Sequence, residues 1–384
     1  MSERDDHRRI GRELDLFHLQ EEAPGAVFWH PRGLAVVRAL EEHVRRVVRA
    51  DGYEEVRTPQ VMARAIWEES GHWEKFGDGM MRVDRAALKP VSCPGAIQIV
   101  RRRDRRDGGP VRLSELGVVH RNERKGQLLG LFRLRQFTQD DGHVFCAERD
   151  VDDEIARFVG RVRALYAAFG LVDVGMVLAL RPAVRAGSDA LWDRAESALS
   201  RAVCGAGLEP SIVPGGGAFY GPKLEIVVRD ARGRRWQCGT IQLDFVLPER
   251  FGLPCVMLHR AMLGSFERFL GLLLERTAGR LPPWLAPEQV RVLAVAPPLA
   301  DYAAEVAALL GARGLRVFAD ARDAPLGARI KRAHDARVPL VAIVGARDRD
   351  ARSVSLRHGS EKTELPLAGA IETLAGACSP PPLG

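Results

Sequence analysis

Three side chains of the kinds that commonly bind zinc are far apart in the sequence. They are Cys93 in KPVSCPG, His143 in QDDGHVF and His259 in VMLHRAMLG. Each is near an arginine-bearing segment of a kind that suits nucleotide phosphates. If the fold brings the three side chains together, they form a zinc site with an open fourth position. This combination predicts a substrate held by a metal inside a nucleotide-binding cleft.

A run of alternating chemical groups leads up to His143. Its members are Arg133, Arg135, Phe137, Gln139, Asp141 and His143. Because residues two apart share a face of a β-strand, all of these side chains would project to one side. Such a face favours a ligand surface, although a charged outer face of a sheet is the alternative. Arg121 and Glu123 share a face in the same way, so the arginine can bind a phosphate while the carboxylate accepts from an amino group.

Arg268 in GSFERF is the next candidate. We expect a helix over 263–276, with Gly264 four residues before Arg268 and Gly271 three residues after it. The two glycines would leave this helix face bare, which would admit a flat purine or a triphosphate. A solvated surface arginine is the alternative.

These candidates require elements that place them. Apolar residues at helical spacing predict a helix over 33–50, followed by a short strand at YEEVR. Period-two patterns over 111–123 and 131–146 predict a long antiparallel hairpin around a polar loop. Further strands are expected at 223–228, 236–245 and 254–259.

The pattern changes after LPPWLAP, residues 281–287, whose three prolines indicate a linker. Beyond it, strand-like segments alternate with helical ones, which predicts a small α/β domain with mostly parallel strands. The length of 384 residues and the 46% hydrophobic content suffice for one large domain and one smaller one.

Composition narrows the class of protein. The net charge of +7 favours a polyanionic partner but does not separate RNA from DNA. The first ten residues are rich in charge and contain no apolar region, and the apolar stretches fall far short of the ~18 residues of a membrane span. We therefore expect a cytoplasmic protein and no membrane partner. Six cysteines without a CxxC pair argue against a secreted disulfide framework.

Several segments resemble a known family. HRNE, FTQDD and GSFERF resemble motifs 2 and 3 of class II aminoacyl-tRNA synthetases, and the specific resemblance is to threonyl-tRNA synthetases. It extends from Asp6 almost to the end of the chain. The segments that carry it, in order, are DLFHLQEEAPGAVFWHPRG, GHWEKF, KPVSCPG, HRNE, QFTQDDGHVFC, GSDALWDRAE, GAFYGPKLE, QCGTIQLDF, HRAMLGSFERF and PPWLAPEQV.

The resemblance implies an α+β catalytic domain over residues 1–281, with an antiparallel six-stranded sheet flanked by helices. A small α/β anticodon-binding domain would follow over 288–384. It also implies a homodimer that forms through the region around Val36 to Pro59. The implied reaction joins L-threonine to ATP, giving threonyl-adenylate and pyrophosphate, and then transfers the threonyl group to tRNA(Thr).

Site residues carry over from the resemblance position by position. Cys93, His143 and His259 fall where that family holds Zn²⁺, with the amino and hydroxyl groups of threonine completing the coordination. Asp141 matches the acid that contacts the hydroxyl. Because valine offers only a methyl group there, such a metal would reject it. The remaining substrate-pocket positions are Gln139, Tyr220, Lys223, Gln237, Thr240 and Gln242.

The nucleotide site is implied in the same way. Arg121 matches the arginine that binds the α-phosphate, Glu123 the contact to adenine, and Phe137 the ring that stacks on the base. Arg268 matches the opposite wall and the γ-phosphate contact, and ATP is expected to bring Mg²⁺. Arg133 is assigned to ATP binding and Lys223 to catalysis. His72, in GHW, matches a histidine associated with transfer to the terminal ribose.

The sequence also departs from the family pattern. It begins where the family's catalytic core begins, so we expect no editing region in cis and uncleared Ser-tRNA(Thr), since losing one methyl contact is worth only about 1–3 kcal/mol. In the last domain, Arg357 matches an anticodon-reading arginine. Asp323 and Asp348 stand where an asparagine and a glutamate are familiar, which makes anticodon recognition less secure than threonine activation.

Two alternatives follow from these departures. One is a threonine-activating ligase that delivers the acyl group to a carrier protein or a small molecule. The other is a catalytically silent tRNA-binding paralogue. The retained last domain and the excess of cations favour tRNA as the partner.

Overall fold

The computed structural model describes residues 6–103, 109–172, 174–230, 232–358 and 361–383. Contacts divide the chain into two compact units, and each is described by itself. The larger unit contains Leu19–Val27 and Val44–Leu272, and the smaller unit contains Met1–His18, Phe28–His43 and Leu273–Pro382. Within the described residues, every helix is too short or too polar to cross a bilayer.

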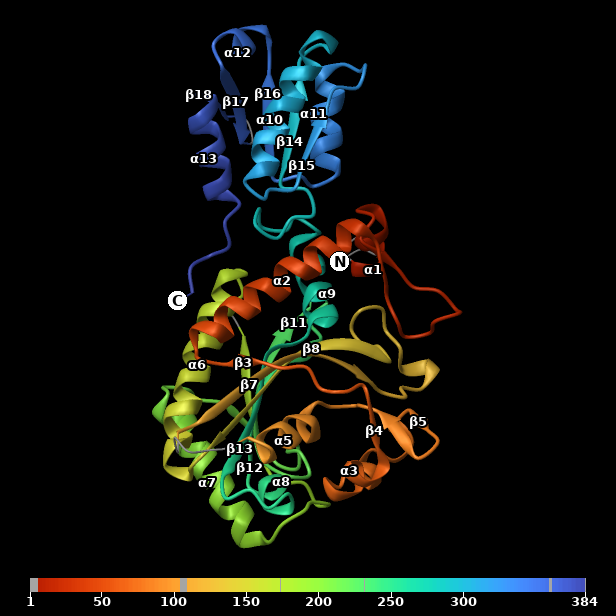
Figure 1. Ribbon diagram of the computed structural model, residues 1–384, viewed down its shortest axis with the longest axis vertical. Helices are drawn as coiled ribbons and strands as arrows, with labels where there is room; N and C mark the ends of the chain where they lie inside the picture. The colour runs from red at the N-terminus through yellow and green to blue at the C-terminus, as the bar shows by residue number, and fades with distance from the viewer. Residues whose placement is uncertain (1–5, 104–108, 173, 231, 359–360, 384) are drawn as a thin grey trace. The chain divides into compact units, whose positions relative to one another are not determined.

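An eight-stranded mixed sheet forms the centre of the larger unit (Figure 1), in the order β10-β9-β11-β12-β13-β8-β7-β3. Only the six central strands, β9 to β7, pair antiparallel throughout. β10 runs parallel to β9, and β3 runs parallel to β7. The expected six-stranded antiparallel sheet is therefore corrected to eight strands with parallel edges. The strands are β3 (Glu54–Glu55), β7 (Val111–His120), β8 (Gln136–Cys146), β9 (Gly175–Ala179), β10 (Ser211–Val213), β11 (Lys223–Arg229), β12 (Arg235–Asp244) and β13 (Val256–Ser265).

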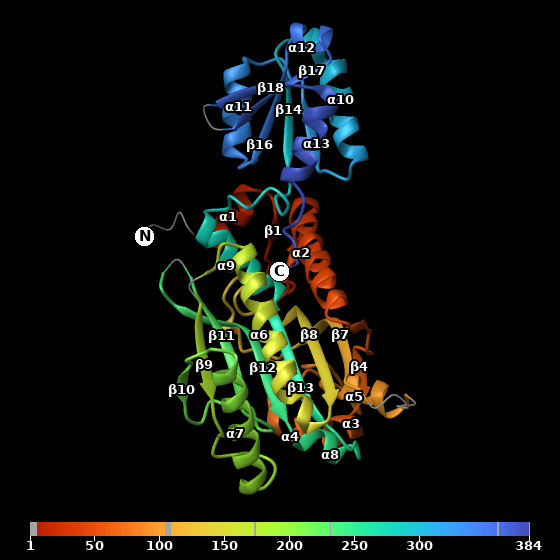
Figure 2. The same cartoon turned by 90° about the vertical axis from the view of Figure 1, so that its left-hand side faces the viewer.

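Helices α6 (Val151–Ala168) and α7 (Asp189–Gly205) pack against each other and along one face of this sheet (Figure 2). On the strand β8, Phe145 continues the alternation that includes His143 and packs with Cys93 of α5 (Cys93–Arg101). Smaller elements of this unit are α3 (Arg64–Glu69), α4 (His72–Phe76), α8 (Val246–Arg250) and the sheet of β4 (Val61–Ala63), β6 (Ala86–Leu88) and β5 (Arg82–Val83). The helices α6 and α7 do not cover the face that carries His143, and a pocket opens on that face.

The smaller unit contains a five-stranded sheet in the order β15-β14-β16-β17-β18. β15, β14 and β16 are parallel, as predicted, and the last two strands are antiparallel. The elements are β14 (Val290–Ala294), α10 (Ala300–Ala312), β15 (Val317–Asp320), α11 (Leu326–Asp335), β16 (Leu340–Val344), α12 (Ala346–Asp350), β17 (Ser353–His358), β18 (Glu361–Pro366) and α13 (Leu367–Ala377).

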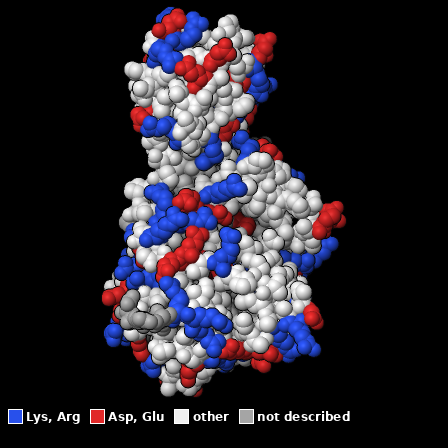
Figure 3. Space-filling view, in the orientation of Figure 1, with Lys and Arg blue, Asp and Glu red and all other residues white. Residues whose placement is uncertain are grey.

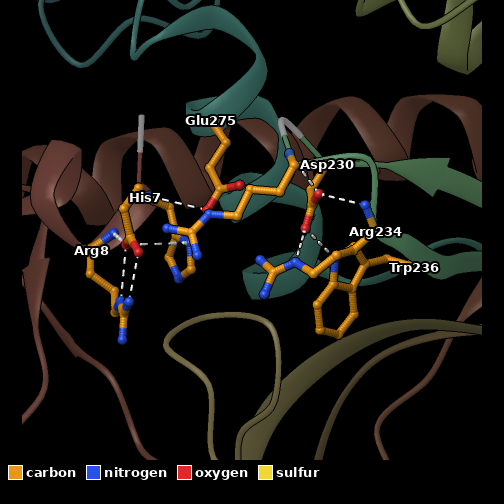
Figure 4. Close-up of polar contacts among 8 residues, drawn as sticks. His7, Arg8, Asp230, Arg234, Trp236 and Glu275 are labelled. Carbon is orange, nitrogen blue, oxygen red and sulfur yellow. Dashed lines mark hydrogen bonds and ion pairs between the residues drawn. The ribbon is translucent and has the colours of Figure 1, made fainter. Parts of the chain in front are cut away.

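The first helix, α1 (His7–Glu13), is tied to α9 (Phe266–Thr277) by a buried pair (Figure 4). His7 Nδ1 lies 2.7 Å from Glu275 Oε1, and both side chains are almost fully buried. The short strands β1 (Phe17–His18) and β2 (Phe28–Trp29) and the long helix α2 (Pro31–Ala50) follow. α2 agrees closely with the helix predicted over 33–50.

One predicted helix is wrong in its start and its surface. β13 runs to Ser265 and α9 begins only at Phe266, so Gly264 belongs to the strand. A Cβ atom on Gly271 would lie 2.9 Å from the ring of Phe132, so that glycine is packed against a neighbour. The bare helix face expected beside Arg268 does not exist, and its glycines serve close packing instead.

Candidate active site

A pocket of about 390 Å³ opens on the His143 face of the large sheet. It collects most of the predicted site residues from segments that are far apart in the sequence. Those that line it are His72, Cys93, Arg121, Phe137, Gln139, Asp141, His143, Tyr220, Lys223, Gln237, Thr240, Gln242, His259 and Arg268. Glu123 and Arg133 are not among the lining residues.

Strand register explains the grouping at the inner end of the pocket. His143 on β8 pairs with His259 on β13, which pairs with Gln242 on β12. The next rung on the same face joins Asp141, Ala261 and Thr240. Because the side chains of one rung point the same way, three strands deliver their polar groups to one place.

Cys93, His143 and His259 offer ligand atoms that all lie within 4.8 Å of one another. All three residues are buried, and His259 Nδ1 has no hydrogen-bond partner within the described chain. Asp244 Oδ2 lies 2.8 Å from His259 Nε2, so that nitrogen donates to the carboxylate. Burial opposes a charge on His259, but Cys93 and Asp244 together raise its pKa to about 10, so a metal ion at Nδ1 would replace a proton there. Burial lowers the pKa of His143 well below its usual value, which keeps the imidazole neutral. A thiol and two imidazoles, one of them oriented by a carboxylate, fit a tetrahedral zinc ion with one open position.

A second group of potential metal ligands does not fit a metal. Asp6, His7 and Glu275 also offer atoms within 4.8 Å of one another. Both Asp6 oxygens, however, accept hydrogen bonds from the Arg8 guanidinium, at 2.9 and 2.6 Å. His7 Nδ1 is already paired with Glu275, so these side chains hold the end of α1.

Polar side chains next to the triad define a small hydrophilic pocket. Tyr220 donates to Gln242 Oε1 at 2.6 Å, and its ring lies 4.8 Å from the His259 ring. Burial raises the pKa of Asp141, which faces this space from β8. The Thr240 hydroxyl is buried and has no partner within the described residues. The Thr240 hydroxyl is therefore available to a substrate with its own hydroxyl and amino groups.

Two arginines line the wider part of the pocket. The Arg121 guanidinium carbon lies 5.1 Å from the centre of the Phe137 ring. Arg268 donates from Nε to the Phe132 carbonyl at 3.0 Å and from Nη1 to the Gln237 carbonyl at 2.8 Å. Burial lowers the pKa of both arginines. Fixed guanidinium groups in a desolvated pocket bind phosphate oxygens strongly.

The strand that carries the alternating side chains does not extend to Arg133 and Arg135, although the sequence pattern predicts that it does. β8 begins at Gln136, so both arginines belong to the preceding loop. Arg133 Nε donates to the Glu123 carboxylate at 2.9 Å, and Arg135 Nε donates to the Glu123 carbonyl at 2.8 Å. In this structure the three residues hold one another beside the pocket.

His72 begins the short helix α4 and is almost fully buried. Its Nδ1 lies 2.8 Å from the Ser70 hydroxyl, and its ring meets Phe219 edge-on at 5.3 Å. Burial lowers its pKa to about 3, so the ring is neutral near pH 7. Lys223, also in the pocket, pairs with Glu225 at 2.7 Å.

Two supporting residues were not predicted. Asp244 lies in QLDF, a segment that was recognised without a role for its carboxylate. Trp236 lies 5.6 Å below the Arg268 guanidinium and donates from Nε1 to Asp230 at 2.8 Å, while Arg234 binds the same Asp230 oxygen (Figure 4). A tryptophan directly before Gln237 on a strand was the available signal.

The residues assigned to anticodon binding lie in the smaller unit. Asp323 is exposed in the loop between β15 and α11, and Arg357 is exposed on β17. Asp348 is buried in α12 and accepts from the Gly345 amide at 2.7 Å and the Ser355 hydroxyl at 3.1 Å. Its carboxylate is therefore used inside the fold.

Two family models match the chain. Residues 80–277 match the class II tRNA synthetase core domain (G, H, P, S and T), and residues 289–376 match an anticodon binding domain. Two similar relatives are the threonine–tRNA ligases of Rhodospirillum rubrum and Paramagnetospirillum magneticum. Each is 48% identical to this chain, and the matches cover 100% and 99% of it, respectively. The chain spans only 62% of the length of either relative.

Solved structures agree with these matches. The RNA binding domain of threonyl-tRNA synthetase from Cryptosporidium parvum has a TM-score of 0.93 and 34% identity, covering 97% of this chain and 98% of that one. A putative threonyl-tRNA synthetase from Aeropyrum pernix has a TM-score of 0.83 and 27% identity, covering 97% and 96%.

Proposed function

The chain belongs to the threonyl-tRNA synthetase family of class II aminoacyl-tRNA synthetases, and from this premise we propose that it activates L-threonine with ATP and transfers the threonyl group to tRNA(Thr). The observation that carries the proposal is that one pocket contains both a zinc-type triad and two partly buried arginines. The match of residues 289–376 to an anticodon binding domain favours tRNA over a carrier protein as the acceptor.

In the first step, the threonine carboxylate attacks the α-phosphate of ATP. Arg121 neutralises charge on the carboxylate and the α-phosphate, while Arg268 binds the β- and γ-phosphates together with Mg²⁺. The bond from the α-phosphorus to the leaving oxygen breaks, which gives threonyl-adenylate and pyrophosphate. The protein's contribution is positioning and charge stabilisation by groups already fixed in place. Phe137 stacks on adenine, and Glu123, with Arg133, lies at the edge of the base.

Cys93, His143 and His259 would hold Zn²⁺, which supplies a Lewis acid that binds the amino and hydroxyl groups of the substrate. Asp141 accepts from the threonine hydroxyl, and Gln139, Tyr220, Thr240 and Gln242 complete the small pocket. Valine would leave these polar groups unpaired and is therefore rejected. Gln237 and Lys223 complete the boundary between the amino acid and the nucleotide.

In the second step, a hydroxyl of the terminal tRNA ribose takes the threonyl group and AMP leaves. Neutral His72 is proposed to position that ribose. We assign the catalytic domain to 1–281 and the anticodon-binding domain to 288–384, where Arg357 and Asp323 contact the anticodon and Asp348 fixes the adjacent turn. Dimerisation through residues 36–59 is part of the proposal, and the mass in solution checks it.

The test is threonine-dependent exchange between ATP and pyrophosphate, followed by acylation of a tRNA(Thr) transcript. We expect exchange with threonine, weaker exchange with serine and none with valine, and then charged tRNA. Because the exchange measures adenylate formation, its serine result is independent of any editing activity. Exchange without charging would overturn the assignment of tRNA as the acceptor, and no exchange with threonine would overturn the activity.

A further inference from the structure

The two faces of β8 carry different chemistry. Phe137, Gln139, Asp141 and His143 face the pocket, whereas Thr138 and Asp140 point to the opposite side. Asp140 is 1% exposed, although a carboxylate is costly to bury without hydrogen bonds. Nothing in the proposed reaction uses it.

Asp140 lies opposite an irregularity in β13. Ala261 pairs with Asp141 and Ser265 pairs with Gln139, so Met262, Leu263 and Gly264 all oppose Asp140 alone. Gly264 has φ +75°, and a Cβ atom there would lie 2.4 Å from the Cys238 carbonyl oxygen. Backbone N–H groups in such a bulge lose their ladder partners and need other acceptors.

The Asp140 carboxylate supplies those acceptors. Its oxygens accept from the amides of Met262 at 2.7 Å, Leu263 at 3.1 Å and Gly264 at 2.7 Å. An alternative role for Asp140 is to neutralise the buried Arg260, but Asp140 Oδ2 lies 3.9 Å from Arg260 Nη1. The amides are therefore its main partners. On α6, the Tyr166 hydroxyl donates to the Met262 carbonyl at 2.9 Å and holds the other side of the bulge.

The bulge leads directly into the helix that carries Arg268. The Ser265 hydroxyl accepts from the Arg268 amide at 3.2 Å and donates to Glu267 at 2.8 Å. Glu267 in turn accepts from the Thr138 amide at 3.0 Å, so β8 holds the bulge through Asp140 and the start of α9 through Thr138. Moving the bulge would move the Arg268 side chain away from the Phe132 and Gln237 carbonyls that aim it.

We propose that Asp140, supported by Tyr166, is the positioning residue for Arg268, and that it sets the affinity for ATP through the bulge at 262–264. The proposal rests on the proposed function only in taking ATP as the ligand of Arg268. Threonine affinity is set by the other face of β8 and is therefore not controlled by Asp140.

The test compares Asp140→Asn with the wild-type chain in direct binding of ATP with Mg²⁺, measured by calorimetry, and in exchange kinetics. The asparagine places an N–H₂ group where one carboxylate oxygen accepts. We expect at least about a tenfold weaker ATP affinity, with the KM for threonine within about twofold. The matched control is Glu154→Gln, a buried carboxylate paired with Arg112 on the same unit, which should leave ATP affinity unchanged.

The double variant Asp140→Asn/Arg268→Ala decides how Asp140 acts. If it acts only through Arg268, the double variant binds ATP no more weakly than Arg268→Ala alone. Additive losses, or a less heat-stable Asp140→Asn with unchanged ATP affinity, would overturn the proposal. If Asp140→Asn does not fold, Tyr166→Phe is measured instead, and an unchanged ATP affinity there overturns it.

The binding measurement separates the two proposals. Wild-type protein that binds ATP but shows no threonine-dependent exchange would overturn threonine activation, while the ATP affinities still decide the role of Asp140. Wild-type protein that does not bind ATP would overturn both.

Discussion

Asp244 determines which nitrogen of His259 is free for a metal. Its Oδ2 accepts from His259 Nε2 at 2.8 Å, while its Oδ1 accepts from the amides of Val246 and Leu247 at 2.7 and 2.9 Å. All these interactions are buried, so the carboxylate cannot turn without losing them. Donating its second ring N–H to a carboxylate fixes the tautomer of a ligating histidine and raises its basicity.

Replacing Asp244 by asparagine should therefore weaken zinc binding. The amide nitrogen would meet the Nε2–H donor, which favours the tautomer with its proton on Nδ1. We expect zinc affinity to fall about 10- to 100-fold, measured by competition with a chelator, and we expect Cys93→Ala to remove stoichiometric zinc. Unchanged zinc content in both variants would contradict the assignment of the triad.

His72 makes the stability of the fold depend on pH. Burial lowers its pKa from 6.5 to about 3, so below pH 6.5 the unfolded chain binds a proton that the folded chain does not. The free energy of unfolding therefore falls as the pH decreases from 6.5 towards 3, by up to about 1.4 kcal/mol per pH unit from this group. His72→Phe should remove this part of the slope in urea titrations between pH 7 and 5. Parallel stability curves for the two proteins would show that His72 is not responsible.

Sequence reasoning grouped Phe137, Gln139, Asp141 and His143 correctly because alternation along one strand is a local property. It placed Arg133 and Arg135 on the same strand wrongly, because the loop around Glu123 captures both before β8 begins. For Asp140, which is in the same motif, the sequence predicts no role. Its function depends on a bulge in another strand, which no local pattern indicates.

At the scale of elements, β7 is held by a buried ion pair. Glu115 of β7 accepts from Lys89 Nζ at 2.7 Å and from the Thr58 amide at 2.8 Å, and Lys89 is fully buried. Glu115 lies opposite Asp141 in the register, so the pair supports the strand behind the pocket. Lys89 itself follows β6 and is distant in sequence from its partner.

Glu115→Gln should lower the free energy of unfolding by about 3–5 kcal/mol, because it leaves the Lys89 charge buried without a counter-charge. The control is Glu148→Gln, which breaks an exposed pair with Arg194 and should cost less than about 1 kcal/mol. Urea unfolding of both variants measures the difference. If both variants lose the same free energy of unfolding, burial does not make the Lys89–Glu115 pair more important for stability than the exposed pair.

The elements themselves were predicted unevenly for physical reasons. The central hairpin and the parallel strands of the smaller unit have strong periodicity, and both are confirmed. The edge strand β3 lies within the short strand predicted at YEEVR, whereas β10 contains only three residues, too few for a recognisable pattern. The predicted start of α9 is too early, because apolar residues occur on both sides of Gly264 and Ser265 and their pattern does not mark where the strand ends.

At the scale of the whole molecule, the family predicted from ten ordered segments is confirmed by the comparisons. On the face shown in Figure 3, Lys and Arg side chains are interspersed with Asp and Glu side chains. Positive and negative side chains therefore lie side by side on this face, and the view does not mark a surface for tRNA.

In the smaller unit, the buried Arg329 holds a loop at one end of the sheet. It is 2% exposed and donates to the carbonyls of Ala324 at 3.0 Å, Asp320 at 2.9 Å and Val295 at 3.3 Å. These carbonyls lie just beyond the carboxyl ends of β14 and β15, the edge at which open α/β sheets bind their ligands. Asp323, proposed to contact the anticodon, is in the loop that Arg329 holds.

Arg329→Ala should separate the two steps of the reaction. It leaves three carbonyl oxygens without their donor, so the loop carrying Asp323 loses its fixed shape. We expect the KM for tRNA(Thr) to rise at least about tenfold, while threonine-dependent exchange stays within about twofold, because the pocket residues all belong to the larger unit. Arg313→Ala is the control, since it breaks only an exposed pair with Glu372. If exchange falls as much as charging does, the smaller unit contributes to activation itself, and amino-acid activation is not separate from tRNA recognition.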